Sequence, residues 1–169
     1  DIDDDSAGFL VDALFELVPD ATADQRVAGW QANNRDVSIE IPHDGATSFG
    51  AVSALRVSDN GDAFDVGPPA SSSSVGFDGW LYLACIVHGD DVAPVCTVNT
   101  RAAQVVPAAG SAPSVSEKAE IGADSSSQSI AKGPIAFAHV WAVPGGPSGV
   151  GNNPAVEQAF VDGLAAAVF

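Results

Sequence analysis

The stretch Trp80-Leu-Tyr-Leu-Ala-Cys-Ile-Val-His88 is the clearest strand in this chain of 169 residues. It is apolar and aromatic almost throughout, and Gly89-Asp-Asp91 follows it directly. An apolar run that ends at a polar, glycine-containing turn is typical of the first strand of a hairpin. We therefore expect the chain to turn back here, with the second strand in Val92–Val98.

The two cysteines lie in the two arms of this predicted hairpin. If Asp90 and Asp91 form a two-residue loop, Cys85 and Cys96 are equally far from its centre and face each other. Facing residues on neighbouring strands come close enough for a disulfide. However, this register makes them a hydrogen-bonded pair with the wider Cα spacing, and Pro94 can disturb the ladder. The sequence leaves two alternatives, a Cys85–Cys96 disulfide or two buried free thiols.

Working outward, short strand patterns recur on both sides of the hairpin. Val37, Ile39 and Ile41 alternate with polar residues, as in a half-buried strand. Asn60-Gly61 is a strong hairpin turn. Val105–Val115 is a loop or a weak strand. Further strands are predicted at Phe49–Val57, Ala63–Val66, Glu117–Gly122 and Ile135–Val143.

Both ends of the chain predict helices. Apolar residues recur at helical spacing in Phe9–Val18, which favours a short amphipathic helix, although the same run also fits an apolar strand. Asn153 as the cap and Pro154 at the first helical position predict a final helix. Its apolar stripe is formed by Val156, Phe160 and Leu164.

Short strands with Gly- and Pro-rich turns, and helices only near the ends, predict an all-β fold. We expect an antiparallel β-sandwich of the jelly-roll kind in a single globular domain. Residues 1–35 are expected to form an acidic tip, the N-terminal helix and a connector that holds Trp30. Residues 36–169 are expected to form the sandwich with its terminal helix.

Four segments resemble the laminin-G / concanavalin A-like jelly roll in their order and rough spacing. They are the Trp-containing strand Gly79–Gly89, the strand and turn Ala119–Asp124, the strand Gly133–Trp141 and the helix Asn153–Val168. The resemblance covers roughly residues 39–169, and the family's Y-x-N/D-G strand after the hairpin is absent. It implies a lectin, a glycanase, an adhesion module or a viral surface protein, and fold alone does not choose among these functions.

The charge of the chain is its second informative feature. Six Lys and Arg stand against 22 Asp and Glu, which gives a formal net charge of −16. Such a surface strains the folded state by self-repulsion unless salt screens it, and the Debye length falls to about 3 Å near 1 M salt. In its acidity the chain is similar to proteins of halophilic archaea and their viruses.

The same charge limits the partners. Nucleic-acid binding requires basic side chains that displace counterions from phosphates, and the six of this chain are scattered. We therefore expect no nucleic-acid partner and no membrane partner. No apolar stretch approaches the about 20 residues that span a bilayer.

One turn offers a candidate metal site. Asp59, Asn60, Asp62 and Asp65 supply closely spaced oxygen ligands of the kind that suits Ca²⁺. The run lacks the EF-hand pattern, and in so acidic a chain it also fits a solvated turn. No other cofactor is expected.

No catalytic set is recognisable, so we expect a protein that is not an enzyme. A glycosidase needs two carboxylates that flank the scissile bond, whereas Glu40 and Glu120 each stand alone on a predicted strand, where a solvated face is expected. Among the tryptophans, Trp80 and Trp141 are expected in the core, and Trp30 is the candidate for an exposed aromatic side chain.

Two hypotheses about function follow. The first is a non-enzymatic structural subunit of a halophilic virus particle, a capsid, capsid-decorating or spike-type protein that forms homo-oligomers or binds other virion subunits. Its candidate contact residues are Phe9, Leu10, Leu14 and Trp30. The second is an extracellular carbohydrate-binding module, secreted or on a viral attachment protein, that binds a host-surface glycan.

Overall fold

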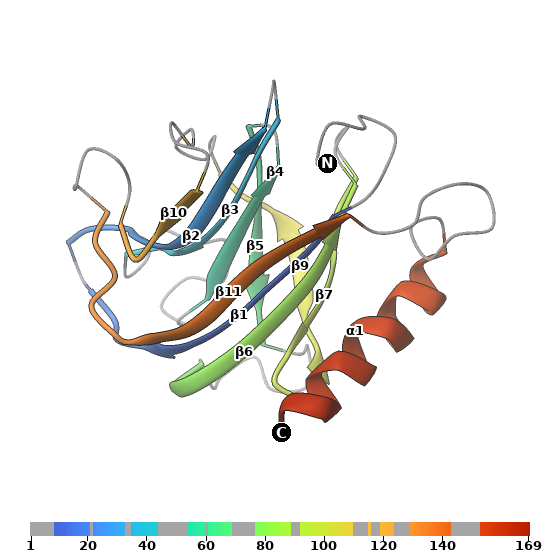
Figure 1. Ribbon diagram of the computed structural model, residues 1–169. Helices are drawn as coiled ribbons and strands as arrows, with labels where there is room; N and C mark the ends of the chain where they lie inside the picture. The colour runs from blue at the N-terminus through green and yellow to red at the C-terminus, as the bar shows by residue number, and fades with distance from the viewer. Residues whose placement is uncertain are drawn as a thin grey trace.

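The computed structural model of the chain describes residues 9–20, 22–32, 35–43, 54–59, 61–68, 77–88, 92–109, 115, 119–123, 129–142 and 153–169. Over these residues two antiparallel sheets pack against each other, and one helix lies outside one of them (Figure 1). The predicted all-β antiparallel sandwich is confirmed, with a helix at its C-terminal end.

The front sheet has five strands in the order β11-β1-β6-β7-β8. They are β1 (Phe9–Leu17), β6 (Gly79–Val87), β7 (Val95–Val98), β8 (Arg101–Ala102) and β11 (Ile135–Ala142). β1 pairs with β6 on one side and with β11 on the other. Segments far apart in the sequence therefore form the centre of this sheet.

The back sheet has six strands in the order β10-β2-β3-β4-β5-β9. They are β2 (Gln25–Ala32), β3 (Arg35–Ile41), β4 (Leu55–Asp59), β5 (Asp62–Gly67), β9 (Gln104–Pro107) and β10 (Ala119–Ile121). Gly61, with a φ of 92°, lies between the paired strands β4 and β5 and confirms the predicted hairpin. Residues 49–53 of the predicted second strand lie outside the described part of the chain.

Alternate residues of both sheets form the core between them. Successive side chains of a strand point to opposite faces, and the inward set is apolar along β1 and β6 and along most of β3 and β4. The largest fully buried side chains of this core are Phe9, Phe15, Ile39, Leu55, Leu81 and Leu83.

The prediction of a helix at Phe9–Val18 is wrong, because this run forms β1. Its inward residues pack in the main core, while Leu10 and Leu14 on the other face contact a second apolar cluster beneath the helix. A strand covered on both faces is apolar at successive positions and lacks the simple alternation of a half-buried strand. The prediction of a connector that holds Trp30 is also wrong, because this segment, residues 20–34, contains β2. The sandwich therefore begins before residue 36.

Helix α1 (Pro154–Val168) begins as predicted, with the Asn153 side chain accepting a hydrogen bond from the backbone of Ala155 at 3.0 Å. It lies against β6 and β7 on the outside of the front sheet. The predicted apolar stripe is not its buried face, because Glu157, Val161 and Ala165 are buried instead. Among the described residues no helix has the length and apolar character needed to cross a membrane.

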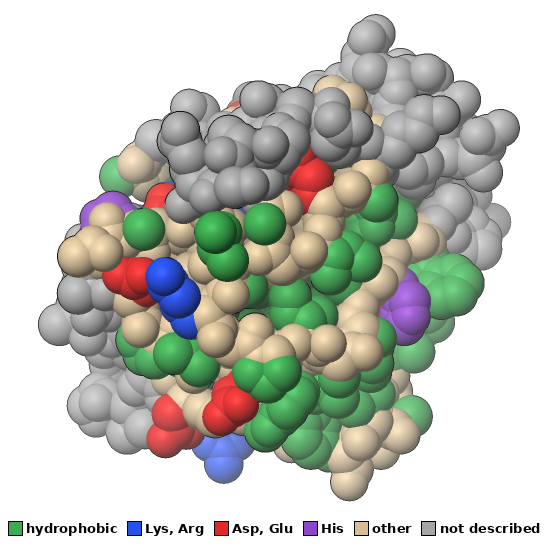
Figure 2. All heavy atoms as spheres, turned by 60° about the vertical axis from the view of Figure 1, so that its left-hand side comes forward, with side chains coloured by type: hydrophobic (Ala, Val, Ile, Leu, Met, Phe, Trp, Pro, Cys, Tyr) green, Lys and Arg blue, Asp and Glu red, His purple; other side chains and the backbone are tan. Residues whose placement is uncertain are grey.

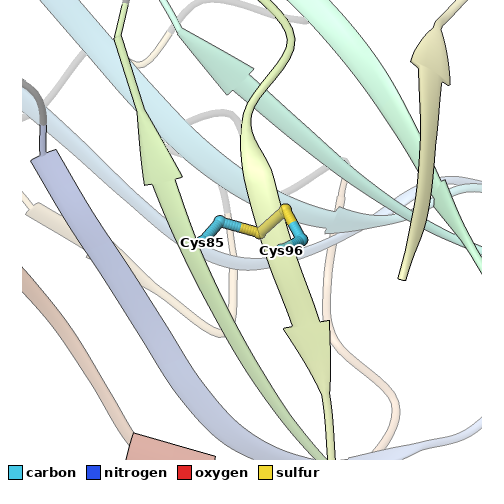
Figure 3. Close-up of a disulfide and its surroundings, with 2 residues drawn as sticks. All are labelled: Cys85 and Cys96. Carbon is cyan, nitrogen blue, oxygen red and sulfur yellow. A yellow bond between two sulfur atoms is a disulfide. The ribbon is translucent and has the colours of Figure 1, made fainter. Parts of the chain in front are cut away.

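The β6–β7 hairpin confirms the first of the two cysteine alternatives. Cys85 and Cys96 face each other in the ladder and form a disulfide with a Cα–Cα distance of 4.2 Å (Figure 3). This distance is typical of a non-hydrogen-bonded pair. It is not the wider Cα–Cα spacing of a hydrogen-bonded pair, which the predicted register implied. Pro94 precedes β7 and leaves its ladder intact. Residues 89–91 lie outside the described part of the chain.

Candidate functional site

The outer face of the front sheet carries the polar and aromatic side chains that point away from the core. In β1 this outward set includes Asp12, which is paired with Ala84 of β6 and with His139 of β11. Because directly opposite residues share a face of the sheet, the Asp12 and His139 side chains lie on the same side.

Asp12 is buried and accepts hydrogen bonds from two neighbouring strands. The Tyr82 hydroxyl donates to Asp12 Oδ2 at 3.1 Å, and His139 Nδ1 lies 3.2 Å from Asp12 Oδ1. Burial raises the pKa of Tyr82, and the nearby Asp12 carboxylate raises it further. Tyr82 therefore remains a protonated donor at neutral pH, and Asp12 fixes the position of the His139 ring.

Three alternate residues of β11 form an aromatic row beside Asp12. The ring centroids of Phe137 and His139 are 4.9 Å apart and stacked, and those of His139 and Trp141 are 5.6 Å apart. Trp141 is 56% exposed, although a core position was expected. We call Phe137, His139 and Trp141 the aromatic row.

The other two tryptophans also differ from expectation. Trp80 is the second residue of β6, lies on the outer face and is 45% exposed, whereas Trp30 is 8% exposed and packs in the main core. In each case the strand register determines whether the side chain faces the core or the solvent. Trp30 is paired with the inward Val37, and Trp80 with the outward Glu16. Sequence composition cannot supply this register.

Helix α1 adds an apolar surface to the same side of the molecule. Its acidic residues face the sheet, where His88 Nε2 lies 3.0 Å from Glu157 Oε2 and the Thr97 hydroxyl donates to Asp162 Oδ1 at 2.8 Å. Every exposed residue of α1 is apolar. We call this set the helix strip: Pro154, Ala155, Val156, Ala159, Phe160, Gly163, Ala166, Ala167 and Val168.

The helix strip stands out because the chain is so acidic. Val156 is 47% exposed and Phe160 is 39% exposed. The helix strip contains no ionisable residue. Figure 2 brings the left-hand side of Figure 1 forward and shows a further band of hydrophobic side chains that reaches the right-hand rim, where a histidine lies among them. Exposed apolar surface is thus present on more than one side.

The contact residues predicted from sequence do not form a surface. Phe9, Leu10 and Trp30 are buried, and Leu14 is half-buried in the cluster beneath α1. Their prediction as partner contacts is therefore wrong, because Phe9, Leu10 and Leu14 lie on β1, an interior strand of the front sheet, and Trp30 of β2 faces the main core.

The residues of the predicted calcium site do not converge. Asp59 and Asp62 face each other at the end of the β4–β5 hairpin. Asp65 lies on the opposite face, where it is buried and bonded to Arg56 at 2.9 Å. Asn60 lies outside the described residues. Within the described ranges no group of three His, Cys, Asp or Glu side chains is placed to hold a metal ion.

A buried ionic cluster, which the sequence did not predict, lies on the outer face of the back sheet. Arg26 is fully buried and lies 3.0 Å from both Glu40 Oε1 and Glu120 Oε2. Burial raises the pKa of Glu40, and the Arg26 guanidinium opposes this shift. The expectation that Glu40 and Glu120 line solvated faces is therefore wrong.

Gly29 explains how the guanidinium fits against the strand. A Cβ at this position would lie 2.7 Å from Arg26 Nη1 and 3.0 Å from a methyl group of Val115. The absence of a side chain lets Arg26 cross the sheet to Glu120. No sequence pattern marks such a cluster, because its three charged residues are far apart along the chain.

No protein-family profile, curated protein or solved structure matches this chain. The resemblance to the laminin-G / concanavalin A-like jelly roll therefore stays a prediction. The structure itself establishes an antiparallel β-sandwich with an apolar helix strip, an aromatic row on β11 and a disulfide in the front sheet.

Proposed function

We propose that this protein is a non-enzymatic structural subunit that assembles with other subunits in concentrated salt, as a capsid, capsid-decorating or spike-type component of a halophilic virus particle. The helix strip is the observation that carries the proposal. An exposed helix normally places charged or polar residues toward water and its apolar stripe toward the core. In α1 the acidic residues Glu157 and Asp162 bond to groups of the front sheet, and every exposed residue is apolar.

The energetics favour covering this strip with another subunit. Burying apolar surface contributes roughly 25 cal/mol per Å² removed from water, and exposed apolar patches commonly mark interaction sites. The strip also contains no carboxylate, so a second acidic subunit can approach it without placing like charges in contact. Screening by molar salt weakens the remaining repulsion between chains of net charge −16.

The disulfide supports a place outside the cytoplasm, at the surface of a virion or in the extracellular space. Disulfides persist in oxidising environments and are rare where thiols are kept reduced. Cys85 and Cys96 are bonded in the core of the front sheet.

The test compares two single substitutions by light scattering after size exclusion, in about 3 M salt. Phe160→Glu places a carboxylate in the helix strip and is expected to lower the mass of the assembly. Ile121→Glu, on β10 of the back sheet, is the matched control, because Ile121 is a 58% exposed apolar residue outside the strip. Equal masses for the two variants would exclude the helix strip as the contact.

A carbohydrate-binding module is the second candidate, and the exposed tryptophans favour it. Trp141 and Trp80 present large rings on the outer face of the front sheet, and His139 is held between Asp12 and its ring neighbours. Flat rings beside a fixed polar group suit the apolar face and the hydroxyls of a sugar. Binding to a glycan array that is lost in Trp141→Ala and kept in Trp30→Phe would support this function over a purely structural one.

A further inference from the structure

We propose that two copies of this chain join edge to edge through β11, so that their front sheets form one antiparallel sheet across a two-fold axis near His139. This pairing uses a different surface from the helix strip and does not rest on the proposed function. It names the partner as a second copy of the chain.

The four edges of the two sheets differ in how well they resist pairing. Proteins protect sheet edges with short strands, charged residues or proline. β8 has two residues and includes Arg101, β10 has three and includes Glu120, and β9 has four and ends at Pro107. β11 has eight residues, Ile-Ala-Phe-Ala-His-Val-Trp-Ala, without Asp, Glu, Lys, Arg or Pro. It is the one unprotected edge among the strands that the structure describes.

The core is also incompletely covered along this edge. Val11 and Ala13 of β1 are 0% exposed, whereas their neighbours Val140 and Ala138 on β11 are only partly buried. β11 forms the rim of its sheet in Figure 1. Among the strands that the structure describes, none pairs with the outer side of β11. A strand added there would cover the exposed flank of these core-facing residues and form a further ladder of backbone hydrogen bonds.

The sequence of β11 suits pairing with itself. In an antiparallel pair centred on His139, Phe137 faces the partner's Trp141 on the outer side, and Ala138 faces the partner's Val140 on the inner side. Aromatic cross-strand pairs stabilise antiparallel strands. A two-fold contact uses the same patch on both subunits, and this patch contains no carboxylate of the strand itself.

Cross-linking tests the pairing directly. His139→Cys places a thiol at the proposed axis, where it would face the same thiol of the partner within disulfide reach. The native cysteines are bonded and buried, so the introduced thiol is the reactive one. We expect mild oxidation in concentrated salt to give a covalent dimer. Thr100→Cys, at the exposed β7–β8 turn, is the control for random collision.

A second substitution, added to His139→Cys, tests whether the cross-link depends on the neighbouring residues of β11. Trp141→Lys is expected to reduce cross-linking to the level of Thr100→Cys, whereas Trp80→Lys, on the interior strand β6, is expected to leave it unchanged. Circular dichroism of both variants is the control that they fold. Cross-linking of His139→Cys no greater than that of Thr100→Cys, or unaffected by Trp141→Lys, would overturn the proposal. Phe160→Glu should leave the cross-link intact, which separates this pairing from contacts of the helix strip.

Discussion

Asp12 and Tyr82 are bonded across β1 and β6, with the Tyr82 hydroxyl donating to Asp12 Oδ2 at 3.1 Å. His139 of β11 approaches the other oxygen of the same carboxylate. Asp12 therefore links the three strands at the centre and edge of the front sheet, and it holds the aromatic row in place. This arrangement makes the stability of the fold sensitive to alkaline pH.

Tyr82→Phe is expected to make unfolding less dependent on pH above about pH 10. In the folded chain the pKa of Tyr82 is raised by burial and by Asp12. Below the ordinary tyrosine pKa near 10 the hydroxyl is protonated in both states, and above it only the unfolded state loses the proton, so stability falls as the pH rises. Urea unfolding between pH 8 and pH 11 measures this slope. Tyr82 is the one tyrosine of the chain, so identical slopes for wild type and variant would contradict the burial of its hydroxyl.

Arg26→Met is expected to destabilise the protein strongly. The substitution leaves Glu40 and Glu120 buried without the guanidinium that lies 3.0 Å from each. Breaking a buried ion pair by removing one partner costs about 3–5 kcal/mol. Arg101→Met is the control, because Arg101 is exposed on β8 and its loss should change the free energy of unfolding by no more than about 0.5 kcal/mol. Similar unfolding midpoints for the two variants would show that the buried cluster contributes little.

Gly133→Ala and Gly163→Ala are expected to shift stability in opposite directions. A Cβ at Gly133 would collide with the backbone carbonyl oxygen of Glu16, so β1 or the turn before β11 must move. A Cβ at Gly163 meets nothing within 4 Å, and alanine in place of glycine inside a helix stabilises by about 0.5–1 kcal/mol. Thermal unfolding in about 3 M salt measures both. A Gly133→Ala variant as stable as wild type would contradict the close approach of residue 133 to β1.

Removal of the disulfide is expected to lower the free energy of unfolding by about 3 kcal/mol, the loop-closure value for a separation of 11 residues. The double substitution Cys85→Ala and Cys96→Ala tests this by urea unfolding. A reducing agent should destabilise the wild type and leave the double variant unchanged. Equal destabilisation of both proteins by the reductant would mean that reduction of the Cys85–Cys96 disulfide is not the cause of the lost stability.

The sequence predicted those parts of the fold in which one face of a strand is buried or a turn has a defined geometry. The hairpin register around Cys85 and Cys96 follows from counting residues on either side of one loop, and the alternation of Val37, Ile39 and Ile41 marks one face of β3. The cap at Asn153 is a local feature, so it was also predictable.

The remaining features depend on which other elements cover each face of a strand. The sequence around that strand does not contain this information. β1 is apolar on both faces because the back sheet covers one and α1 covers part of the other, and this double cover resembles a helical pattern. Trp30 was expected to be exposed and is buried, whereas Trp141 was expected in the core and is exposed. The register of each strand determines which of its sides faces the core. The buried cluster of Arg26, Glu40 and Glu120 joins three strands and has no local pattern at all.

The proposal that this chain is an assembling subunit is tested most directly by sedimentation velocity of the wild-type protein, in about 3 M salt and again near 0.1 M salt. Screening extends over roughly 3 Å or less in the first condition and about 10 Å in the second, so acidic subunits repel each other far more in dilute buffer. We predict a discrete oligomer in concentrated salt that dissociates on dilution of the salt. A single monomeric species of about 17.0 kDa in both conditions would contradict the proposal.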